Sequence, residues 1–368
     1  MQIDNKVLNN DEKIILALRS LYAKFGYTQY KMSKFEEYDL YSNNKDFLVS
    51  DSVITFTDTT GKLMALKPDV TLSIIKNSND EPSTVQKLCY NENVYRVSKG
   101  TNSFKEIMQV GIECFGDVDD YSISEVLYLA SESLNSISSD YILDISSLDI
   151  LQACINRITT SKEEVQQIIK CVSEKNFHGI IKFCDDNQLS YKYFDALKSL
   201  LEISEPVETA LPKVKAIAKE VNALSSYEIL EESVKGLKSE KIRIDFSVIS
   251  DLNYYNGIVF KGFINGVPNS VLSGGQYDKL MRKMKRRSKA IGFAVYLDML
   301  NMFEEIEKYD VDVMILYKEN NDVLNNFIDE QIKCGNRVFA TKKVNSKIKY
   351  KKLVAIEKGE VMTLENNA

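Results

Sequence analysis

The sequence predicts an α+β fold in which an antiparallel sheet is flanked by helices, interrupted by a helical insertion and followed by a small α/β unit. Residues 105–114 alternate between polar and apolar, as a β-strand does. Residues 148–240 are rich in helix formers, with apolar positions three and four apart. The expected units are a first core part (1–147), a helical insertion (148–240), a second core part (241–308) and a C-terminal α/β domain (309–368).

The composition limits the classes of protein that fit. The chain has 368 residues, of which 44% are hydrophobic and 27% charged, enough for two or three domains with their own cores. The formal net charge is -6 and the sequence pI is about 5.3, whereas dedicated nucleic-acid binders usually carry a basic surface. We therefore expect no nucleic-acid partner.

Membrane, disulfide and metal signals are missing from the sequence. No apolar run approaches the ~20 residues of a membrane span, and the first residues lack the basic and apolar regions of a signal peptide. The six cysteines are scattered without a Cys-x-x-Cys pair, which is typical of reduced thiols in the cytoplasm. The one histidine, His178, is expected to be a surface or partly buried helix residue rather than a ligand, so we predict neither a metal site nor a bound cofactor.

The first elements are a helix and a hairpin. Asn10 and Asp11 are expected to cap a helix that Gly26 ends. The apolar face of this helix comprises Ile14, Leu18, Leu21, Tyr22 and Phe25. Residues 51–57 and 63–66 are predicted to pair as a hairpin.

After the hairpin, Pro68 breaks the second strand and a short helix follows. Asp69 and Thr71 stand in the first turn of this helix, where such residues usually cap. They would equally well receive the ammonium or hydroxyl of a ligand.

Three strand segments are expected next, at 87–90, 94–96 and 105–114. Successive side chains of the third segment point to opposite faces. Its core face comprises Met108, Val110 and Ile112. Its other face comprises Gln109, Gly111 and Glu113. The glycine leaves room for something to lie against the sheet; the alternative is a solvated polar face. A helix is expected at 119–134.

The second half returns to strands after the helical insertion, at 242–248 and 252–260. The basic run 282–289 is expected to be a solvated, mobile loop, with contact to a polyanion as the alternative. Residues 290–297 are expected to begin a helix that contains Asp298. From Tyr309 onward the pattern predicts strand, helix, strand and strand.

Several segments together resemble the catalytic core of histidyl-tRNA synthetase, a class II synthetase. The order and spacing of the resemblance hold from about residue 10 to 305, which implies a class II aminoacyl-tRNA synthetase-like antiparallel sheet. The segments are Leu66-Lys67-Pro68-Asp69-Val70-Thr71, Val94-Tyr95-Arg96, Gln109-Val110-Gly111-Ile112-Glu113, Leu252-Asn253-Tyr254-Tyr255, Gly274-Gly275-Gln276-Tyr277-Asp278 and Ala290-Ile291-Gly292-Phe293-Ala294.

The departures from that family fall where the synthetase binds ATP. Arg96 remains at the motif 2 arginine, but Ser98 replaces the glutamate that follows it. The motif 3 arginine falls at Met299, and the arginine before Leu-Asp-Tyr-Tyr at Ser250. The motif 1 proline falls at Ser33. Losing one charge-stabilising donor costs roughly 2.7–4 kcal/mol of barrier, so we expect no useful adenylation.

The positions that would hold the amino acid remain. In this resemblance Asp69 and Thr71 take the ammonium, and Glu113 accepts from an imidazole N–H. Tyr254 or Tyr255 bonds the other ring nitrogen, although both could simply pack against the sheet. The remaining candidates, for the carboxylate, are Gln109 and Arg96.

A synthetase fold with a kept histidine pocket and lost ATP groups resembles the regulatory-subunit family of ATP phosphoribosyltransferase (HisZ). The resemblance implies a non-catalytic cytoplasmic subunit required for the first step of histidine biosynthesis, with free histidine as its feedback effector. It also implies a homodimer that joins a short-form catalytic subunit in a hetero-oligomer. Two rival hypotheses remain: a divergent working histidyl-tRNA synthetase, and a synthetase-like RNA sensor that uses the basic run.

Overall fold

We describe the chain from a computed structural model, for residues 8–45, 48, 53–97, 103–174, 176–187, 193–249, 254–303, 308–357 and 359–367. The chain divides into two compact units at residues 302 and 303. Each unit has a hydrophobic core of its own. Within the described ranges, no helix combines the length and the apolarity that crossing a bilayer requires.

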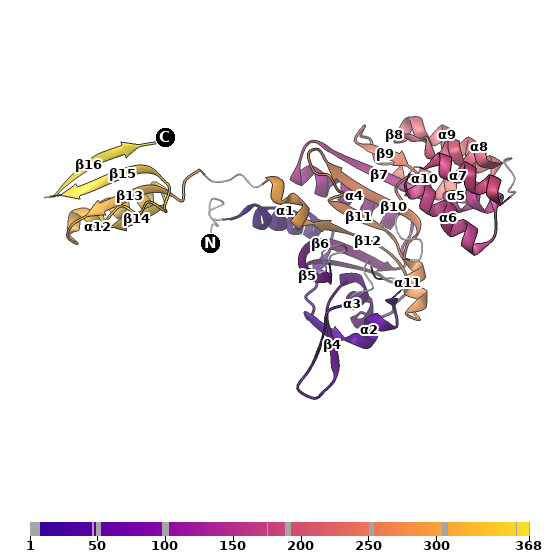
Figure 1. Cartoon of the computed structure of the whole chain (residues 1–368), viewed down its shortest axis with the longest axis horizontal. Coiled ribbons are helices and arrows are strands. Elements are labelled where there is room, and N and C mark those ends of the chain that lie inside the picture. Colours follow the sequence, from indigo (N-terminus) through magenta and orange to yellow (C-terminus); the bar gives the residue numbers. More distant parts are fainter. Residues whose placement is uncertain are drawn as a thin grey trace. The chain divides into compact units, whose positions relative to one another are not determined.

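A nine-stranded sheet is the centre of the first unit (Figure 1). Its strands, in spatial order, are β1 (Thr28–Gln29), β5 (Val85–Val97), β6 (Phe104–Gly116), β12 (Lys289–Tyr296), β11 (Leu272–Gln276), β10 (Asn256–Ile264), β7 (Tyr141–Ser147), β9 (Ile242–Asp245) and β8 (Ser204–Pro206). The six strands from β5 to β7 pair antiparallel, and β1 and β9 join in parallel. This arrangement confirms the predicted antiparallel sheet, and β5 is one continuous strand rather than two segments.

Helices α1 (Asn10–Lys24) and α4 (Asp120–Ile137) cover one face of this sheet. Leu18 and Tyr22 from α1 are buried with Val110 and Ile112 of β6, as the apolar spacing predicts. The predicted cap of α1 was one residue too late. Asn9 is the N-cap, and its side chain and that of Glu12 each accept a hydrogen bond from the other residue's backbone N–H.

The opposite face of the sheet carries a second apolar cluster. It is built by short helices and by a three-stranded sheet of order β2-β4-β3. These elements are β2 (Phe35–Glu37), α2 (Tyr38–Ser42), β3 (Thr55–Thr57), β4 (Leu63–Leu66), α3 (Val70–Asn77) and α11 (Asp278–Lys283). The predicted hairpin is β3 and β4, with a first strand shorter than the predicted 51–57, of which residues 51 and 52 lie outside the described residues. The predicted short helix is α3. Because both faces of β6 are covered, the alternative of a solvated polar face is wrong.

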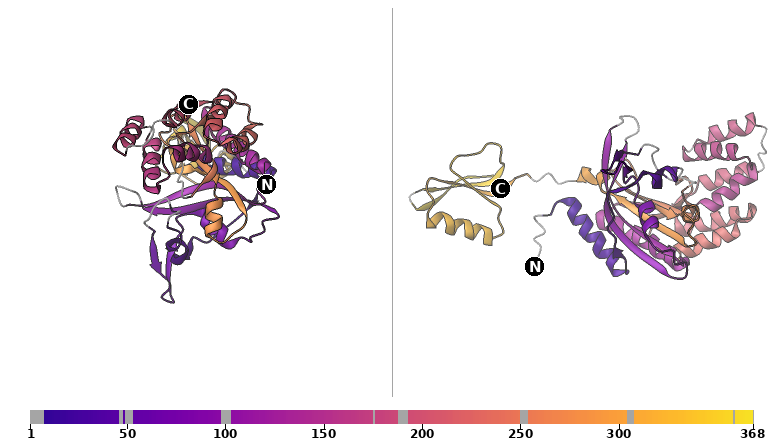
Figure 2. Two further views of the ribbon diagram at one scale, coloured as in Figure 1. Left: turned by 90° about the vertical axis from the view of Figure 1, so that its right-hand side faces the viewer. Right: turned by 90° about the horizontal axis from the view of Figure 1, so that it is seen from below.

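The predicted helical insertion packs beside β7, β9 and β8 (Figures 1 and 2). Its helices are α5 (Leu148–Ile158), α6 (Lys162–Ser173), α7 (Phe177–Asp186), α8 (Phe194–Leu201), α9 (Val207–Glu220) and α10 (Leu224–Val234). The short strand β8 interrupts this series. His178 lies exposed on α7. The boundaries drawn from the sequence for this and the other units stay a prediction.

Two expectations near residue 290 were wrong. Residues 289–296 form the central strand β12, not the start of a helix, and a 3₁₀ helix, η4 (Leu297–Phe303), follows. The run is apolar on every side because β12 lies between β11 and β6 with both faces covered. The basic run is not a loop throughout, because its ends belong to α11 and β12. Its cations Arg282, Lys283, Lys285, Arg287 and Lys289 are exposed, as expected of a solvated segment, while Arg286 donates to the carbonyl of Ile75 and Ser288 donates to Asp80. The mobility of the run stays a prediction.

The C-terminal unit is a four-stranded sheet of order β14-β13-β15-β16 with one helix. Its elements are β13 (Val311–Tyr317), α12 (Asp322–Lys333), β14 (Val338–Thr341), β15 (Tyr350–Glu357) and β16 (Glu360–Asn366). The first four match the predicted order. The sequence pattern missed β16, because every residue of this edge strand is exposed and its apolar residues mark no buried face.

Candidate functional site

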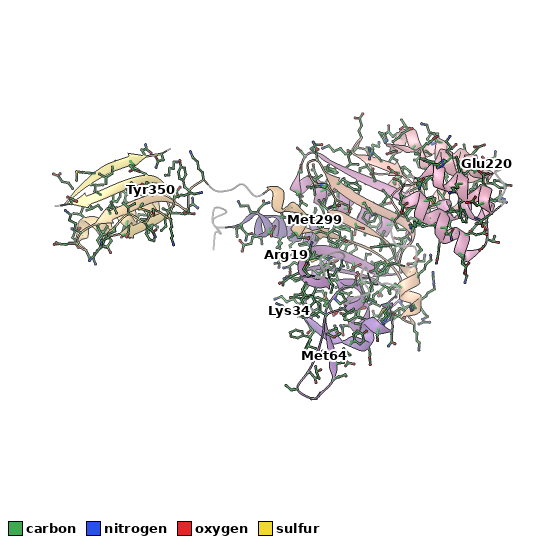
Figure 3. All side chains as sticks on the ribbon, viewed as in Figure 1. Arg19, Lys34, Met64, Glu220, Met299 and Tyr350 are labelled. Atoms are coloured by element: carbon green, nitrogen blue, oxygen red, sulfur yellow. The ribbon has the colours of Figure 1, made fainter. Side chains whose placement is uncertain are left out.

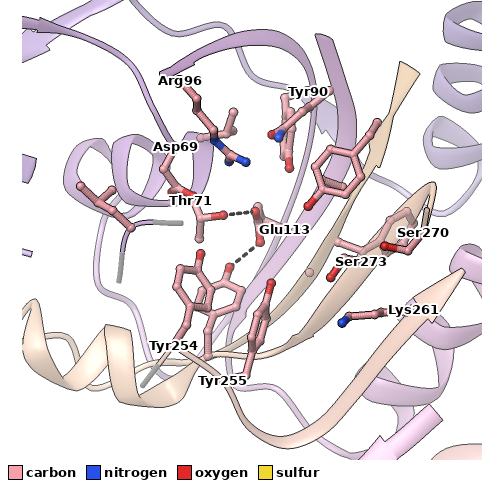
Figure 4. A pocket seen from close by; sticks show the side chains of 18 of the residues that line it. Asp69, Thr71, Tyr90, Arg96, Glu113, Tyr254, Tyr255, Lys261, Ser270 and Ser273 are labelled. Carbon is pink, nitrogen blue, oxygen red and sulfur yellow. Dashed lines mark hydrogen bonds between the residues drawn. The ribbon is translucent and has the colours of Figure 1, made fainter. Parts of the chain in front are cut away.

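A pocket of about 490 Å³ opens on the face of the large sheet that α1 and α4 leave free (Figure 4). Every residue that the sequence predicted for an amino-acid site lines this pocket. These residues come from segments far apart in the chain: the start of α3, the strands β5 and β6, and the turn that precedes β10. The antiparallel pairing of β5, β6, β12, β11 and β10 brings them together.

Asp69 and Thr71 enter the pocket from the first turn of α3. Asp69 is the N-cap of this helix, and its carboxylate accepts a 2.8 Å hydrogen bond from the backbone N–H of Leu72. The capping role that the sequence suggested is therefore real, and the same side chain lines the pocket. Burial raises the pKa of the Asp69 carboxyl, and the nearby Arg96 opposes part of this rise.

Glu113 lies at the centre of the pocket (Figure 4). Only 2% of its surface is exposed. The Thr71 hydroxyl donates to one carboxylate oxygen at 2.7 Å, and the Tyr277 hydroxyl donates to the other at 2.6 Å. Burial nevertheless raises the pKa of Glu113 to about 8, and Asp69 adds to the rise. Among the described residues, Glu113 thus has two hydrogen-bond donors but no cation beside it, and Asp69 depends on the charge of the nearby Arg96.

Tyrosine rings form the wall below Glu113. The ring centroids of Tyr254 and Tyr255 lie 4.6 Å apart, and that of Tyr277 is 6.1 Å from Tyr254. Tyr254 and Tyr277 also belong to the apolar cluster on this face, so the packing role considered for the tyrosine pair applies as well. Burial raises the pKa of all three hydroxyls, which therefore stay protonated and able to donate.

Arg96 lies near the C-terminal end of β5, and Gln109 lies near the middle of β6. The Arg96 side chain donates from Nε to the carbonyl of Pro68 at 3.0 Å and lies near Asp69 (Figure 4). Its charge is therefore shared with a carboxylate of the pocket. Gln109 is buried at 4% exposure and stands opposite Tyr296 in the register between β6 and β12.

The space beside Gly111 is filled by the chain itself. A Cβ built at this position would lie 2.5 Å from the hydroxyl oxygen of Tyr90 and 2.3 Å from the backbone oxygen of Phe293. Tyr90 stands opposite Gly111 in the register between β5 and β6 and lines the pocket. Because Gly111 has no side chain, the Tyr90 ring can lie over β6 at this position. Tyr90 therefore forms part of the pocket wall, and a ligand would bind beside its ring.

Sequence reasoning missed several pocket residues. Tyr277 belongs to the segment Gly274-Gly275-Gln276-Tyr277-Asp278 but had no predicted role, because its contact with Glu113 joins two residues that are 164 positions apart in the sequence. Lys261 and Ser273 gave no motif signal, because only the strand register of β10 and β11 turns them toward the pocket, and Ser270, just before β11, gave none either.

Two of the four positions that depart from the synthetase pattern are among the described residues. Met299 lies on η4 (Figure 3), where it is partly buried and packs against the hydrophobic core, and it does not line the pocket. The Ser33 hydroxyl accepts a hydrogen bond from the backbone N–H of Phe35. Ser98 and Ser250 lie outside the described residues. Among the residues described, no group of three or more His, Cys, Asp or Glu side chains is placed to hold a metal ion.

The fold and the pocket define a class II synthetase-like protein. Residues 4–300 match the family model described as histidyl-tRNA synthetase, so the chain belongs to that family. A solved structure described as an ATP phosphoribosyltransferase regulatory subunit/histidyl-tRNA synthetase from Bacillus halodurans superposes with a TM-score of 0.79. It covers 93% of each chain at 20% sequence identity, and it shows the shared fold.

The relatives in sequence point to one branch of this family. A protein of Caldanaerobacter subterraneus subsp. tengcongensis named ATP phosphoribosyltransferase regulatory subunit is 30% identical over 290 residues. The match covers 76% of this chain and 75% of the relative, so the chain belongs with these regulatory subunits. A chain of the Thermotoga maritima ATP phosphoribosyl transferase (HisG:HisZ) complex shares the fold, with a TM-score of 0.58 at 18% identity over 81% of this chain and 98% of that chain.

Proposed function

We propose that this chain is a non-catalytic regulatory subunit of ATP phosphoribosyltransferase, required for the first step of histidine biosynthesis, and that it binds free histidine to mediate feedback inhibition. Its relationship to named regulatory subunits supports the general role. The observation that carries the histidine proposal is the pair of buried carboxyl groups, Asp69 and Glu113, in one pocket.

Histidine supplies what these carboxyl groups lack. A buried charge costs several kcal/mol unless it is paired or hydrogen-bonded. The ligand's ammonium would lie between Asp69 and Thr71, and its imidazole N–H would donate to Glu113. Tyr254 or Tyr255 would bond the second ring nitrogen. Gln109 and Arg96 are the candidates for the carboxylate.

The binding of histidine regulates the complex only if it favours one conformation. A ligand with equal affinity for two states shifts nothing, however tightly it binds. The segment that ends in α3 and the strands β6 and β10 would therefore change their relative positions slightly between the free and bound states. The chain itself contributes no reacting group in this proposal.

The partner is a short-form catalytic subunit, by analogy with the HisG:HisZ complex from Thermotoga maritima. We also propose that this chain forms a homodimer in the cytoplasm, where its free thiols would remain reduced. Mixing the full chain with such a catalytic subunit should give one co-eluting complex. Transfer of the phosphoribosyl group to ATP should require both chains, and histidine should inhibit it.

A matched pair of variants separates assembly from sensing. Glu113→Gln should leave the complex and its activity intact but weaken inhibition by histidine, since the charge-assisted hydrogen bond to imidazole is lost. Glu163→Gln, on the exposed first turn of α6, should behave as the wild type does. Failure of the two chains to associate, or equal inhibition of both variants, would contradict the proposal.

A working histidyl-tRNA synthetase is the second candidate, because the family model that matches the chain carries that description. It predicts histidine-dependent exchange of pyrophosphate into ATP. We expect no exchange, because Met299 packs in the core where the synthetase pattern has an arginine. The RNA-sensor hypothesis stays open to test: Arg286 is engaged within the chain, but the other cationic side chains of the basic run are exposed, and steeply salt-dependent tRNA binding would support it.

A further inference from the structure

The far end of the pocket carries a group of donors that no role above uses. Lys261 on β10 stands opposite Ser273 on β11 in the strand register. Ser273 in turn stands opposite Ala294 on β12, and Ala294 stands opposite Gly111 on β6. Lys261 and Ser273 therefore lie in the row of the sheet that passes across the pocket floor. Ser270 lines the same end of the pocket (Figure 4).

Lys261 has spare hydrogen-bonding capacity. Its ammonium donates one 3.1 Å hydrogen bond to the carbonyl of Ile249. A lysine ammonium has three donors, so two have no partner among the described residues. Within the described parts of the chain, no carboxylate pairs with Lys261, whereas Arg96 lies near Asp69. Figure 4 shows the Lys261 side chain pointing from β10 toward the inside of the pocket.

Lys261 is also partly removed from water. Burial lowers the pKa of its ammonium, and no nearby charge in the described part of the chain offsets this effect. A partly desolvated cation that faces an open cavity gains free energy from an anion placed there. The hydroxyls of Ser270 and Ser273 line the cavity with it and are further donors for the same anion.

We propose that Lys261, Ser270 and Ser273 form an oxyanion-binding subsite at the end of the pocket away from Asp69 and Glu113. The pocket would then have an acidic part for cationic groups and a basic part for an anion. The oxyanion comes from one of two sources. It is either the carboxylate of the bound amino acid or a phosphate group of a separate ligand, and only the first source rests on the function proposed above.

The strand spacing permits either source. Neighbouring strands lie about 4.8 Å apart, so the backbone of Lys261 starts roughly 14 Å from that of Gly111, three strands away. The lysine side chain extends back over part of this distance. The α-ammonium and α-carboxylate of an amino acid share one carbon, so the first source requires a histidine whose imidazole stays at Glu113 while its α-carbon lies toward Lys261 rather than toward Asp69. A second, phosphorylated ligand could instead occupy this end of the pocket.

Titration calorimetry on the full chain tests the subsite, with Lys261→Met as the variant. Methionine keeps the apolar stem and removes the charge. Lys238→Met, at an exposed position outside the pocket, is the matched control. The probes are histidine, histidinol, which has a hydroxymethyl group in place of the carboxylate, and inorganic pyrophosphate. Thermal unfolding confirms that each variant is folded.

The three probes distinguish the sources. If the subsite holds the amino acid's carboxylate, Lys261→Met should weaken histidine roughly 10- to 100-fold, as expected for a lost charged hydrogen bond, and leave histidinol unchanged. If it holds a separate phosphate, histidine affinity should stay the same and pyrophosphate binding should fall by a similar factor.

The proposal is overturned if Lys261→Met binds histidine and pyrophosphate as the wild type does. It is also overturned if Lys238→Met causes the same losses. If the wild type does not bind histidine at all, the proposed histidine-sensing function fails, and the pyrophosphate titration alone then decides on the subsite: saturable binding that Lys261→Met abolishes supports it, and no binding to the wild type rejects it.

Discussion

The Thr71 hydroxyl donates a 2.7 Å hydrogen bond to the carboxylate of Glu113, joining the first turn of α3 to the central strand β6. Thr71 also lies two residues after Asp69, which is the N-cap of α3. The hydrogen bond thus fixes the distance between the part of the pocket proposed for an ammonium and the part proposed for an imidazole. A change in the position of α3 would alter both contacts together.

The pKa of Glu113 makes the stability of the ligand-free protein depend on pH. An unfolded glutamate titrates near 4.5, and the folded one at about 8. Between these values the unfolded chain binds fewer protons than the folded chain, so stability falls as pH rises, by about 1.4 kcal/mol per pH unit. Glu113→Gln removes this loss. We expect the variant to become more stable than the wild type by an increasing margin from pH 5 to pH 8.

Urea unfolding followed by tyrosine fluorescence measures this difference at each pH, since the chain has 20 tyrosines and no tryptophan. The exposed variant Glu163→Gln should show the wild-type profile. If Glu113→Gln and the wild type have parallel profiles, then the pKa of Glu113 is not raised in the folded protein. Its charge is in that case already stabilised without a ligand, and the reason given for a cationic ligand is lost.

Tyr277 lowers the pKa of Glu113 by donating to its carboxylate at 2.6 Å. Removing this donor in Tyr277→Phe should raise the pKa of Glu113 further, because the ionised form loses a hydrogen bond. A carbon-13 NMR titration of labelled glutamate carboxyl groups would follow the change. Tyr227→Phe, which removes a similar bond to Glu231 on α10, should leave the Glu113 signal in place. An unchanged Glu113 midpoint in Tyr277→Phe would show that the bond is absent in solution.

Gly292 leaves the space that the Glu113 carboxylate occupies. A Cβ at this position would lie 2.0 Å from a Glu113 carboxylate oxygen and 2.5 Å from the backbone oxygen of Ile112. We expect Gly292→Ala to destabilise the protein by about 1–3 kcal/mol, as overpacking does, and to abolish histidine binding. Gly236→Ala, where a Cβ meets nothing within 4 Å, serves as the control in thermal unfolding and calorimetry. Equal behaviour of the two variants would refute the predicted crowding.

Lys67 forms a buried ion pair with Glu92 at 2.9 Å, and its side chain has 0% exposure. Breaking such a pair by removing one partner typically costs about 3–5 kcal/mol, because the other charge stays partly buried. Lys67→Met should therefore lower the urea midpoint strongly. Lys213→Met breaks the exposed pair with Glu205 and should change the urea midpoint very little, because solvent screens such pairs. Similar losses for the two variants would show that the pair at Lys67 is exposed to water.

Much of this architecture follows from local sequence. The alternation of 105–114 predicted β6, and the apolar spacing of Leu18 and Tyr22 predicted the buried face of α1. The prediction failed at β12, because a central strand covered on both faces reads as a continuous apolar run that does not distinguish strand from helix. It also failed at β16, because an exposed edge strand has no buried face.

The candidate site shows the same limit. Asp69, Thr71 and Glu113 could be predicted, because they stand in motifs with a recognisable spacing. Lys261 and Ser273 could not, because their place in the pocket depends on which strand pairs with which and in what register. That information is carried by contacts between distant segments and not by any one of them.

The most direct test of the central claim is a calorimetric titration of free histidine into the full chain at neutral pH. We expect saturable binding at one site per chain, weakened roughly 10- to 100-fold by Glu113→Gln, because glutamine cannot lose a proton to become the charged acceptor of the imidazole N–H. The exposed variant Glu163→Gln should bind as the wild type does. An absence of binding to the wild type, or an affinity that Glu113→Gln leaves unchanged, would contradict the account.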